Sequence, residues 1–206
     1  NLMGGGRLGQ LLERLSISRT LGEFLEEKKS HGWKKGEGFI ETGDKNLADY
    51  ITDKDFLPTD FFTEKGIEIT SMPKCDIKYF HRPRKKELYT PPHLLIRKIL
   101  GKNKLITKYS DNYLTFLSDI YSIHAPLEQK HELIGIADYL KENDYLLRFF
   151  ILATSSRVKI IKATSLYDED ILNIPYPENL KDVKLSKADE VILNDSMSYF
   201  LNSYSK

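Results

Sequence analysis

The sequence predicts an α+β fold, with N-terminal helices, an antiparallel β meander, then a helix pair and a C-terminal helix. Apolar residues recur at helical spacing near the start and again from residue 133. Between these regions, short apolar runs end at glycine-containing turns, which is typical of strands. Because strands and helices form separate blocks, we expect an α+β arrangement in place of a wound parallel sheet.

Two short helices are expected at the N-terminus. Helical spacing relates Leu8, Leu11, Leu12 and Leu15, and it returns in Leu21, Phe24 and Leu25. Thr20 and Glu23 form a capping-box pattern, in which each side chain satisfies a backbone donor at the start of the second helix.

The middle of the chain carries the strand patterns. Four glycines within residues 31–43 favour a loop or hairpin, and residues 66–70 alternate like a strand. Residues 94–100 and 104–109 flank Gly101 as a hairpin, which residues 113–117 and 119–123 extend as a meander.

Helical patterns then return. A helix pair is predicted over 133–140 and 145–153, with a break at Asn143-Asp144. Two prolines make residues 171–177 extended, because each denies helix to the residue before it. Ser186 is expected to cap a final helix.

Composition excludes several classes of protein. The 206 residues are 40% apolar and 30% charged, as in ordinary globular domains. The single cysteine, Cys75, permits neither an intrachain disulfide nor a cysteine-rich zinc site. No apolar run approaches the roughly 20 residues that span a bilayer, so we expect a cytoplasmic protein without a membrane partner. The opening Asn1 suggests a piece of a longer polypeptide.

Charge is unevenly distributed along the chain. Residues 74–108 contain 11 basic and two acidic side chains, a net charge of +9, whereas the rest of the chain has a net charge of −8. Such asymmetry is expected of a protein that meets phosphate on one face. A solvated lysine-rich surface is the alternative.

Two patterns for chemistry are weak. Gly4, Gly6 and Gly9 have the spacing of a dinucleotide-binding loop, but no strand precedes them to deliver that loop. Asp60 with Asp76 and Lys78 resembles the layout of a magnesium-dependent nuclease, a pattern that arises often by chance in a highly charged chain.

Other chemistry has no motif in this sequence. The five histidines lack the spacing of a zinc helix, so no metal site is expected. Neither an adenine-methylation motif nor a glycine-rich S-adenosylmethionine loop is present. We therefore expect that the chain is not an enzyme and binds no cofactor.

A series of segments carries a resemblance to a known protein family: residues 7–15 with 20–25, then 33–43, 92–99, 121–123, 149–156 and 170–177. In their order along the chain they resemble the C-terminal region of TaqI-like and type IIG N6-adenine DNA methyltransferases of restriction-modification systems. Residues 7–15 with 20–25 are similar to the helical stretch that follows the catalytic domain in this family, and residues 33–43 resemble the glycine-rich turn where its target recognition domains begin. Where the family has Leu-Asn-Ser between the paired helices, this chain has Lys141-Glu-Asn-Asp.

The resemblance implies a division of the chain and a function. Residues 1–30 would be a helical junction from a missing catalytic domain, 31–185 the DNA target-recognition domain, and 186–206 a C-terminal helix. The partners would be duplex DNA and the methyltransferase catalytic domain of the same polypeptide, which would bind S-adenosylmethionine. The chain would supply specificity while an adenine is flipped into the catalytic domain.

The candidate DNA-binding residues form three groups. Glycines allow close backbone approach to phosphate, and arginine can bind guanine bidentately. Arg97 and Lys98 occupy successive strand positions, so at most one is expected to face DNA. The residues are Lys34, Lys35, Gly36, Gly38 and Thr42 in the first group, Arg82, Arg84, Lys85 and Lys86 around Pro83 in the second, and Arg97 and Lys98 in the third.

Alternatives remain open at these positions. The glycines could serve only a tight turn, and Trp33 and Phe39 fit core packing better than stacking on DNA. At the level of function, the helices at 131–153 and 188–203 could instead dock a partner subunit. Binding to phosphate would weaken steeply with salt, whereas an apolar interface would respond little.

Overall fold

A computed structural model of the protein describes residues 6–16, 18–41, 46–101, 103–155, 165–178 and 185–203. Helices and an antiparallel sheet confirm the predicted α+β class. Backbone contacts divide the chain into two compact units, one of Lys28–Glu142 and one of Asn1–Glu27 with Asn143–Lys206. The predicted divisions after residues 30 and 185 concern function and stay predictions.

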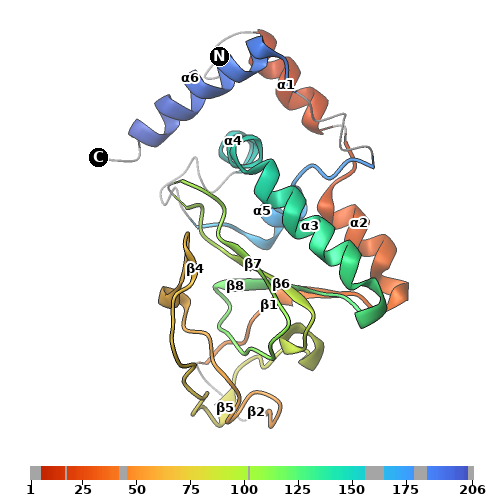
Figure 1. Ribbon diagram of the computed structural model, residues 1–206, viewed down its shortest axis with the longest axis vertical. Helices are drawn as coiled ribbons and strands as arrows, with labels where there is room; N and C mark the ends of the chain where they lie inside the picture. The colour runs from red at the N-terminus through yellow and green to blue at the C-terminus, as the bar shows by residue number, and fades with distance from the viewer. Residues whose placement is uncertain are drawn as a thin grey trace. The chain divides into compact units, whose positions relative to one another are not determined.

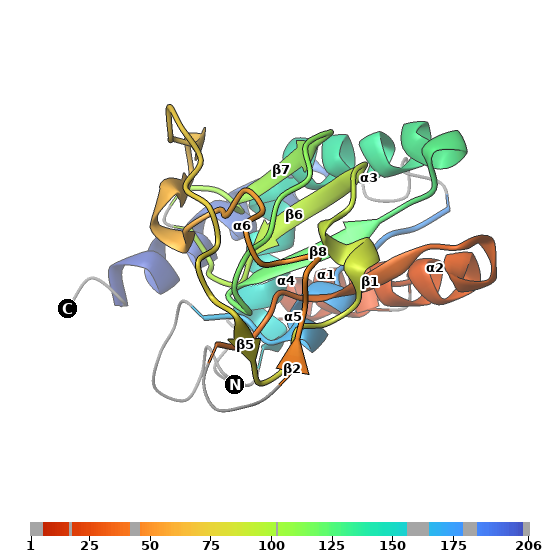
Figure 2. The ribbon, with the colours of Figure 1, turned by 90° about the horizontal axis from the view of Figure 1, so that it is seen from below.

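The first unit, Lys28–Glu142, contains a four-stranded sheet whose neighbouring strands are antiparallel, in the order β1-β8-β6-β7 (Figure 2). Its strands are β1 (Lys34–Glu37), β6 (His93–Arg97), β7 (Thr107–Ser110) and β8 (Ile120–His124). The predicted hairpin is confirmed as β6 and β7, which pair from His93↔Ser110 to Ile96↔Thr107.

The strand order departs from a simple meander at β8, which pairs with β6 and not with β7. The expected strand at 113–117 is absent, and this segment makes single bridges at Thr115 and Leu117. Leu114 and Phe116 from the same segment are buried in the core. The segment between β7 and β8 therefore contributes side chains to the core in place of a strand to the sheet, an outcome of tertiary packing that strand spacing alone does not predict.

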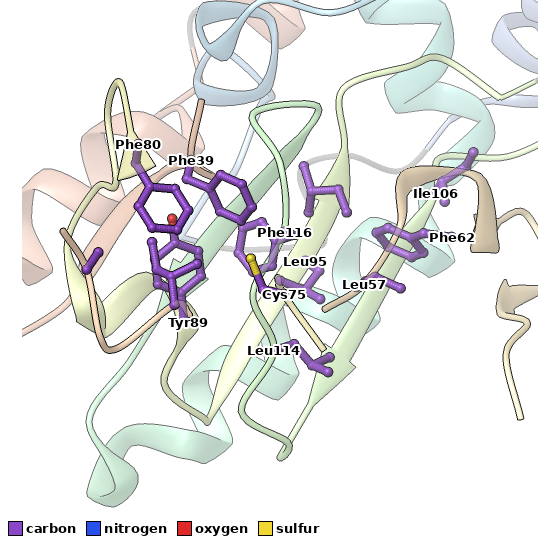
Figure 3. Close-up of a cluster of buried hydrophobic side chains, with 13 residues drawn as sticks. Phe39, Leu57, Phe62, Cys75, Phe80, Tyr89, Leu95, Ile106, Leu114 and Phe116 are labelled. Atoms are coloured by element: carbon purple, nitrogen blue, oxygen red, sulfur yellow. The ribbon is translucent and has the colours of Figure 1, made fainter. Parts of the chain in front are cut away.

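The core of this unit is a cluster of buried aromatic and aliphatic side chains (Figure 3). Phe39 and Phe80 meet edge to face, with ring centroids 5.1 Å apart. Two small two-stranded sheets contribute Phe80 and Phe62 to the cluster. In one, β2 (Asn46–Leu47) pairs with β5 (Tyr79–Phe80), and in the other, β3 (Phe62–Thr63) pairs with β4 (Gly66–Ile67). Of the predicted strand at 66–70, only Gly66–Ile67 is a strand.

Short helical turns and one longer helix complete the unit. The 3₁₀ turns are η1 (Lys28–His31), η2 (Thr59–Phe61), η3 (Lys86–Tyr89) and η4 (Leu127–Gln129). Helix α3 (Lys130–Glu142) contacts β6 and β7 and buries Leu133 and Ile136 (Figure 1). Turn η3 contacts β1 and β8 and leads from the basic segment into β6.

The second unit contains helices α1 (Gly6–Ser16), α2 (Leu21–Glu27), α4 (Asp144–Thr154), α5 (Asp168–Leu172) and α6 (Lys187–Ser203). The predicted capping box of α2 is confirmed, because the Thr20 amide donates to Glu23 over 2.7 Å and the Glu23 amide donates to the Thr20 hydroxyl over 3.1 Å. Ser186 caps α6 in the same way through Asp189.

The ends of α3, α4 and α5 bear on two further predictions. The predicted break is confirmed, since α3 ends at Glu142 and α4 begins at Asp144. The prediction that residues 171–177 are extended is wrong at its start, because Ile171 and Leu172 are the last two residues of α5. The Tyr167 and Asp170 capping box favours this helical turn, and the prolines act only downstream of it.

The glycines near the N-terminus do not form a nucleotide-binding loop in the described residues. Gly6 and Gly9 lie within α1, and Gly4 lies outside the described residues. In the part of the chain that the structure describes, the helices are all too short or too polar to cross a bilayer.

Candidate nucleic-acid interface

Strand β1 presents its two lysines to opposite sides of the sheet. Lys34 is opposite His124 and Lys35 is opposite Ile123, and successive side chains of a strand alternate between faces. A Cβ on Gly36 would lie 3.3 Å from the Leu88 side chain, so Lys34 and Gly36 share the face that carries η3. Lys35 belongs to the other face.

Gly38 is required by packing within the protein. A Cβ at this position would lie 2.1 Å from the Phe116 carbonyl oxygen and 2.4 Å from that of Leu117. The Gly38 amide donates to the Ile120 carbonyl over 2.9 Å, which holds the strand at this distance. The absence of a side chain therefore serves close contact between backbone segments, a role different from approach to phosphate.

The segment Arg82–Lys86 lies directly beside β1. The Ile40 amide donates to the Arg82 carbonyl over 3.1 Å, and Arg84 Nε donates to the Gly38 carbonyl over 3.4 Å. The Arg84 guanidinium also forms an ion pair with Glu37. The structure thus brings together the first two groups of predicted residues, although Glu37 and Arg84 are 47 positions apart.

Within this segment, three cations are exposed to solvent and one is not. Arg82, Lys85 and Lys86 are exposed, whereas the Arg84 side chain is 25% exposed and bound to Glu37. Arg84 has a left-handed φ of 66°, an unusual conformation for arginine. The contacts of its guanidinium with β1 hold this turn, so Arg84 fixes the segment that carries the exposed cations.

Arg97 and Lys98 are also bound within the chain. Lys98 Nζ donates to Glu37 Oε2 over 2.6 Å. Arg97 Nη1 donates to the Phe62 carbonyl over 3.0 Å, and Nη2 lies 3.8 Å from Asp60. Their side chains are 20% and 16% exposed, so both are mainly engaged within the chain, and the expectation that at most one of them faces DNA stays a prediction. The remaining predicted residue, Thr42, lies outside the described residues.

The aromatic residues of the glycine-rich segment belong to the core, as the packing interpretation predicts. Trp33 is 2% exposed, and its indole nitrogen donates to Gln129 Oε1 over 2.6 Å. Phe39 is fully buried in the cluster of Figure 3. Neither ring is available to stack on a base.

The structure also forms a cavity that sequence analysis missed. Its volume is about 660 Å³, and it is lined by Asp49, Tyr50, Lys54, Asp55, Lys74, Lys86 and Tyr113. Only Lys86 was among the predicted residues. The others come from segments between positions 49 and 113, and no spacing along the sequence relates them. Their proximity depends on the crossover that brings residue 113 beside residue 50.

The carboxylates of the nuclease-like pattern are exposed. Asp60 is 98% exposed and lies near Arg97, and Asp76 and Lys78 are exposed outside any strand. Among the described residues, no group of three or more His, Cys, Asp and Glu side chains could hold a metal ion.

Comparison with known proteins adds no family assignment. No protein-family model matches the chain, and no curated protein is detectably similar to it in sequence. The resemblance to target-recognition regions therefore rests on the similar sequence segments alone.

Proposed function

We propose that this chain is the DNA target-recognition part of a restriction-modification N6-adenine methyltransferase, of type IIG or a related class. The observation that carries the proposal is the exposure of Arg82, Lys85 and Lys86 on a segment held against β1. Such a fixed row of cations suits the phosphates along one rim of a DNA groove.

The segment differs from a mobile basic tail because its backbone is bound at both ends. Arg82 is paired with Ile40, and η3 begins at Lys86, where the Thr90 hydroxyl donates to the Lys86 carbonyl over 3.1 Å. Binding DNA would therefore require ordering of three side chains but not of the backbone, which reduces the entropic cost of association. Lys34, on β1, lies on the face of the sheet that carries η3 and adds a further cation to that face.

The proposal assigns recognition to this chain and chemistry to a partner. Duplex DNA would be held against a methyltransferase catalytic domain of the same polypeptide, which would bind S-adenosylmethionine and receive the flipped adenine. The chain itself would bind no cofactor and catalyse no reaction. Such a system acts on DNA in the cytoplasm, where we expect the chain to function.

The alternative of a protein-docking module has less support from side-chain burial. Leu133 and Ile136 of α3 are fully buried in the chain, and residues 146–153 of α4 are at most 5% exposed. Most of the described apolar residues that suggested a docking face are therefore already covered. Tyr145 of α4 and Val191 of α6, which are 39% and 59% exposed, are exceptions among the described side chains of these helices.

Duplex binding can be measured by fluorescence anisotropy with a labelled duplex at two salt concentrations. We expect weak binding with little sequence preference, because the catalytic domain that completes the clamp is absent. The affinity should fall steeply as salt rises, since each neutralised phosphate releases condensed counterions. Absence of binding at low salt would contradict the proposal.

A second assay separates recognition from chemistry. The purified chain is incubated with duplex DNA, S-adenosylmethionine and magnesium, and we expect neither methylation nor cleavage. Magnesium-dependent cleavage that Asp76→Ala abolishes would instead identify the nuclease-like carboxylates as an active site and overturn the assignment.

A further inference from the structure

The cavity beside the Arg82–Lys86 segment has the size and lining of a ligand site. Its volume of about 660 Å³ falls within the range of roughly 300–1,000 Å³ that is usual for small-molecule sites. All of its lining residues belong to the unit Lys28–Glu142. Duplex recognition by the exposed cations makes no use of most of them.

The two tyrosines in the cavity are held in fixed orientations. The Tyr50 hydroxyl donates to the Arg84 carbonyl, and the Tyr113 hydroxyl donates to the Tyr50 carbonyl over 2.7 Å. Partial burial raises the pKa of Tyr113 to about 12, so its hydroxyl keeps the proton that it donates at neutral pH. Both side chains also pack against the core, and both hydroxyl protons are used internally. These residues therefore offer a ligand the part of each aromatic ring that lines the cavity.

The charged residues give the lining a positive excess. Lys74 and Asp55 form an ion pair with each other. The remaining ionic side chains of the lining are Lys54, Lys86 and Asp49, all of them exposed. Two ammonium groups can donate to an anion, while one carboxylate can accept from an N–H or O–H group of the same ligand.

We propose that this cavity binds a single unstacked nucleotide. The base would pack against the rings of Tyr50 and Tyr113, because every base has an apolar π-face that stacks on aromatic side chains. The phosphate would lie at Lys54 and Lys86, and Asp49 would accept a hydrogen bond from an amino or hydroxyl group. The ligand is either a free nucleoside monophosphate or an unpaired nucleotide of a DNA strand.

The inference goes beyond the proposed function and can fail separately from it. Lys86 is shared with the surface proposed for duplex DNA, but the tyrosines and Lys54 are not part of that surface. A free mononucleotide can occupy the cavity without a duplex. Conversely, Arg82 and Lys85 can contact duplex phosphates while the cavity stays empty.

The test uses the whole chain and two fluorescent probes, 2-aminopurine nucleoside monophosphate and a single-stranded trinucleotide with 2-aminopurine at its centre. We expect fluorescence quenching on binding, as the base stacks on tyrosine. Binding of both probes indicates that the nucleotide itself is recognised, and binding of the trinucleotide alone indicates an unpaired nucleotide of a strand. Both results support the proposal, and binding of neither probe overturns it.

Substitutions then locate the bound base. Tyr113→Leu should raise the Kd roughly 5- to 100-fold, the range expected for losing one base-aromatic stack. Tyr113→Phe retains the ring and should change the Kd much less. Equal losses in both variants would show that the hydroxyl matters and the ring does not, which contradicts stacking.

Charge reversal provides a variant whose folding is not in question. Lys54 is exposed, so Lys54→Glu should leave the circular dichroism spectrum and Tm unchanged while weakening binding of both probes more than tenfold. Lys65→Glu, at another exposed lysine outside the cavity, is the matched control and should leave binding unchanged. Equal effects of the two reversals, or none at Lys54, would overturn the site.

Discussion

Two sets of cations that look equivalent in the sequence have different roles in the structure. Arg82, Lys85 and Lys86 are exposed on a fixed segment, whereas Arg84, Arg97 and Lys98 are bound to groups of the same chain. The difference arises from acceptors distant in sequence, since Glu37 precedes Arg84 by 47 positions and Lys98 by 61. A basic run therefore reveals how many cations are present, but not which of them a ligand can reach.

Glu37 binds two of the three internally bound cations, Arg84 and Lys98. Its carboxylate is 22% exposed and accepts from both Arg84 and Lys98. Charge-assisted hydrogen bonds in such a partly buried site are stronger than those between exposed groups. Substitutions in the internally bound region around β1 should therefore change stability, whereas substitutions in the exposed segment should change binding.

The largest effect is expected at Gly38. Gly38→Ala would place a Cβ 2.1 Å from the Phe116 carbonyl oxygen, so backbone must move, and we expect a loss of about 3 kcal/mol or more in the free energy of unfolding. Urea denaturation measures this loss. Gly135→Ala in α3, where the added Cβ would meet no atom within 4 Å apart from its chain neighbours and the backbone of its own helix, should stabilise by up to about 1 kcal/mol. Similar effects at the two glycines would show that Gly38 is not a packing position.

The second expected effect is a dependence of the free energy of unfolding on pH, caused by the buried His93 of β6. Burial lowers the pKa of His93 to about 4, with the Leu88 carbonyl at Nδ1 opposing and the neighbouring His124 reinforcing the shift. The imidazole of the unfolded chain takes up its proton with a pKa near 6.5, whereas that of the folded chain stays neutral down to about pH 4. The free energy of unfolding is therefore highest above pH 6.5 and decreases as the pH falls from 6.5 toward 4. The loss should reach about 2 kcal/mol between pH 7.5 and pH 5.

Urea denaturation at these two pH values checks the assignment. His93→Gln removes the titrating group, so this variant should lose most of the pH dependence, whatever its own stability. His131→Gln, at an exposed histidine, is the control and should retain the dependence of the wild type. A wild-type pH dependence in His93→Gln would exclude the buried imidazole as its source.

A smaller loss of stability is expected when Glu37 is neutralised. Glu37→Gln leaves Arg84 and Lys98 without their counter-charge in a partly buried site, which should cost about 1–2 kcal/mol. Glu128→Gln, at an exposed acid, should change stability by less than about 0.5 kcal/mol. If chemical denaturation gives the same stability for both variants, Glu37 does not hold the two cations.

Local sequence patterns predicted the parts of the fold that neighbouring residues determine. The caps at Thr20 and Ser186, the break at Asn143 and the hairpin of β6 and β7 all depend on residues close in sequence. The position of β8 was not predictable in this way. It pairs with β6, and the segment that leads into it places Phe116 in a core whose other members come from positions 39 to 120.

The candidate site was predictable only in part for the same reason. The basic residues at 82–86 are apparent in the sequence, and three of them are exposed. Predicting that Arg84 and Lys98 bind within the chain would have required the position of Glu37 in the fold. The cavity could not be predicted because it depends on the contact between residues 50 and 113, which no local pattern encodes.

The central claim is that Arg82, Lys85 and Lys86 contact DNA phosphates. The most direct measurement compares the slope of log affinity against log salt for Arg82→Ala/Lys85→Ala/Lys86→Ala with that for Lys104→Ala/Lys108→Ala/Lys141→Ala, which also removes three exposed charges. The first variant should make this negative slope less steep by about 2–3 units, and the second should change it by less than about one unit. Both variants should remain folded. Equal slopes in the two variants would contradict the account.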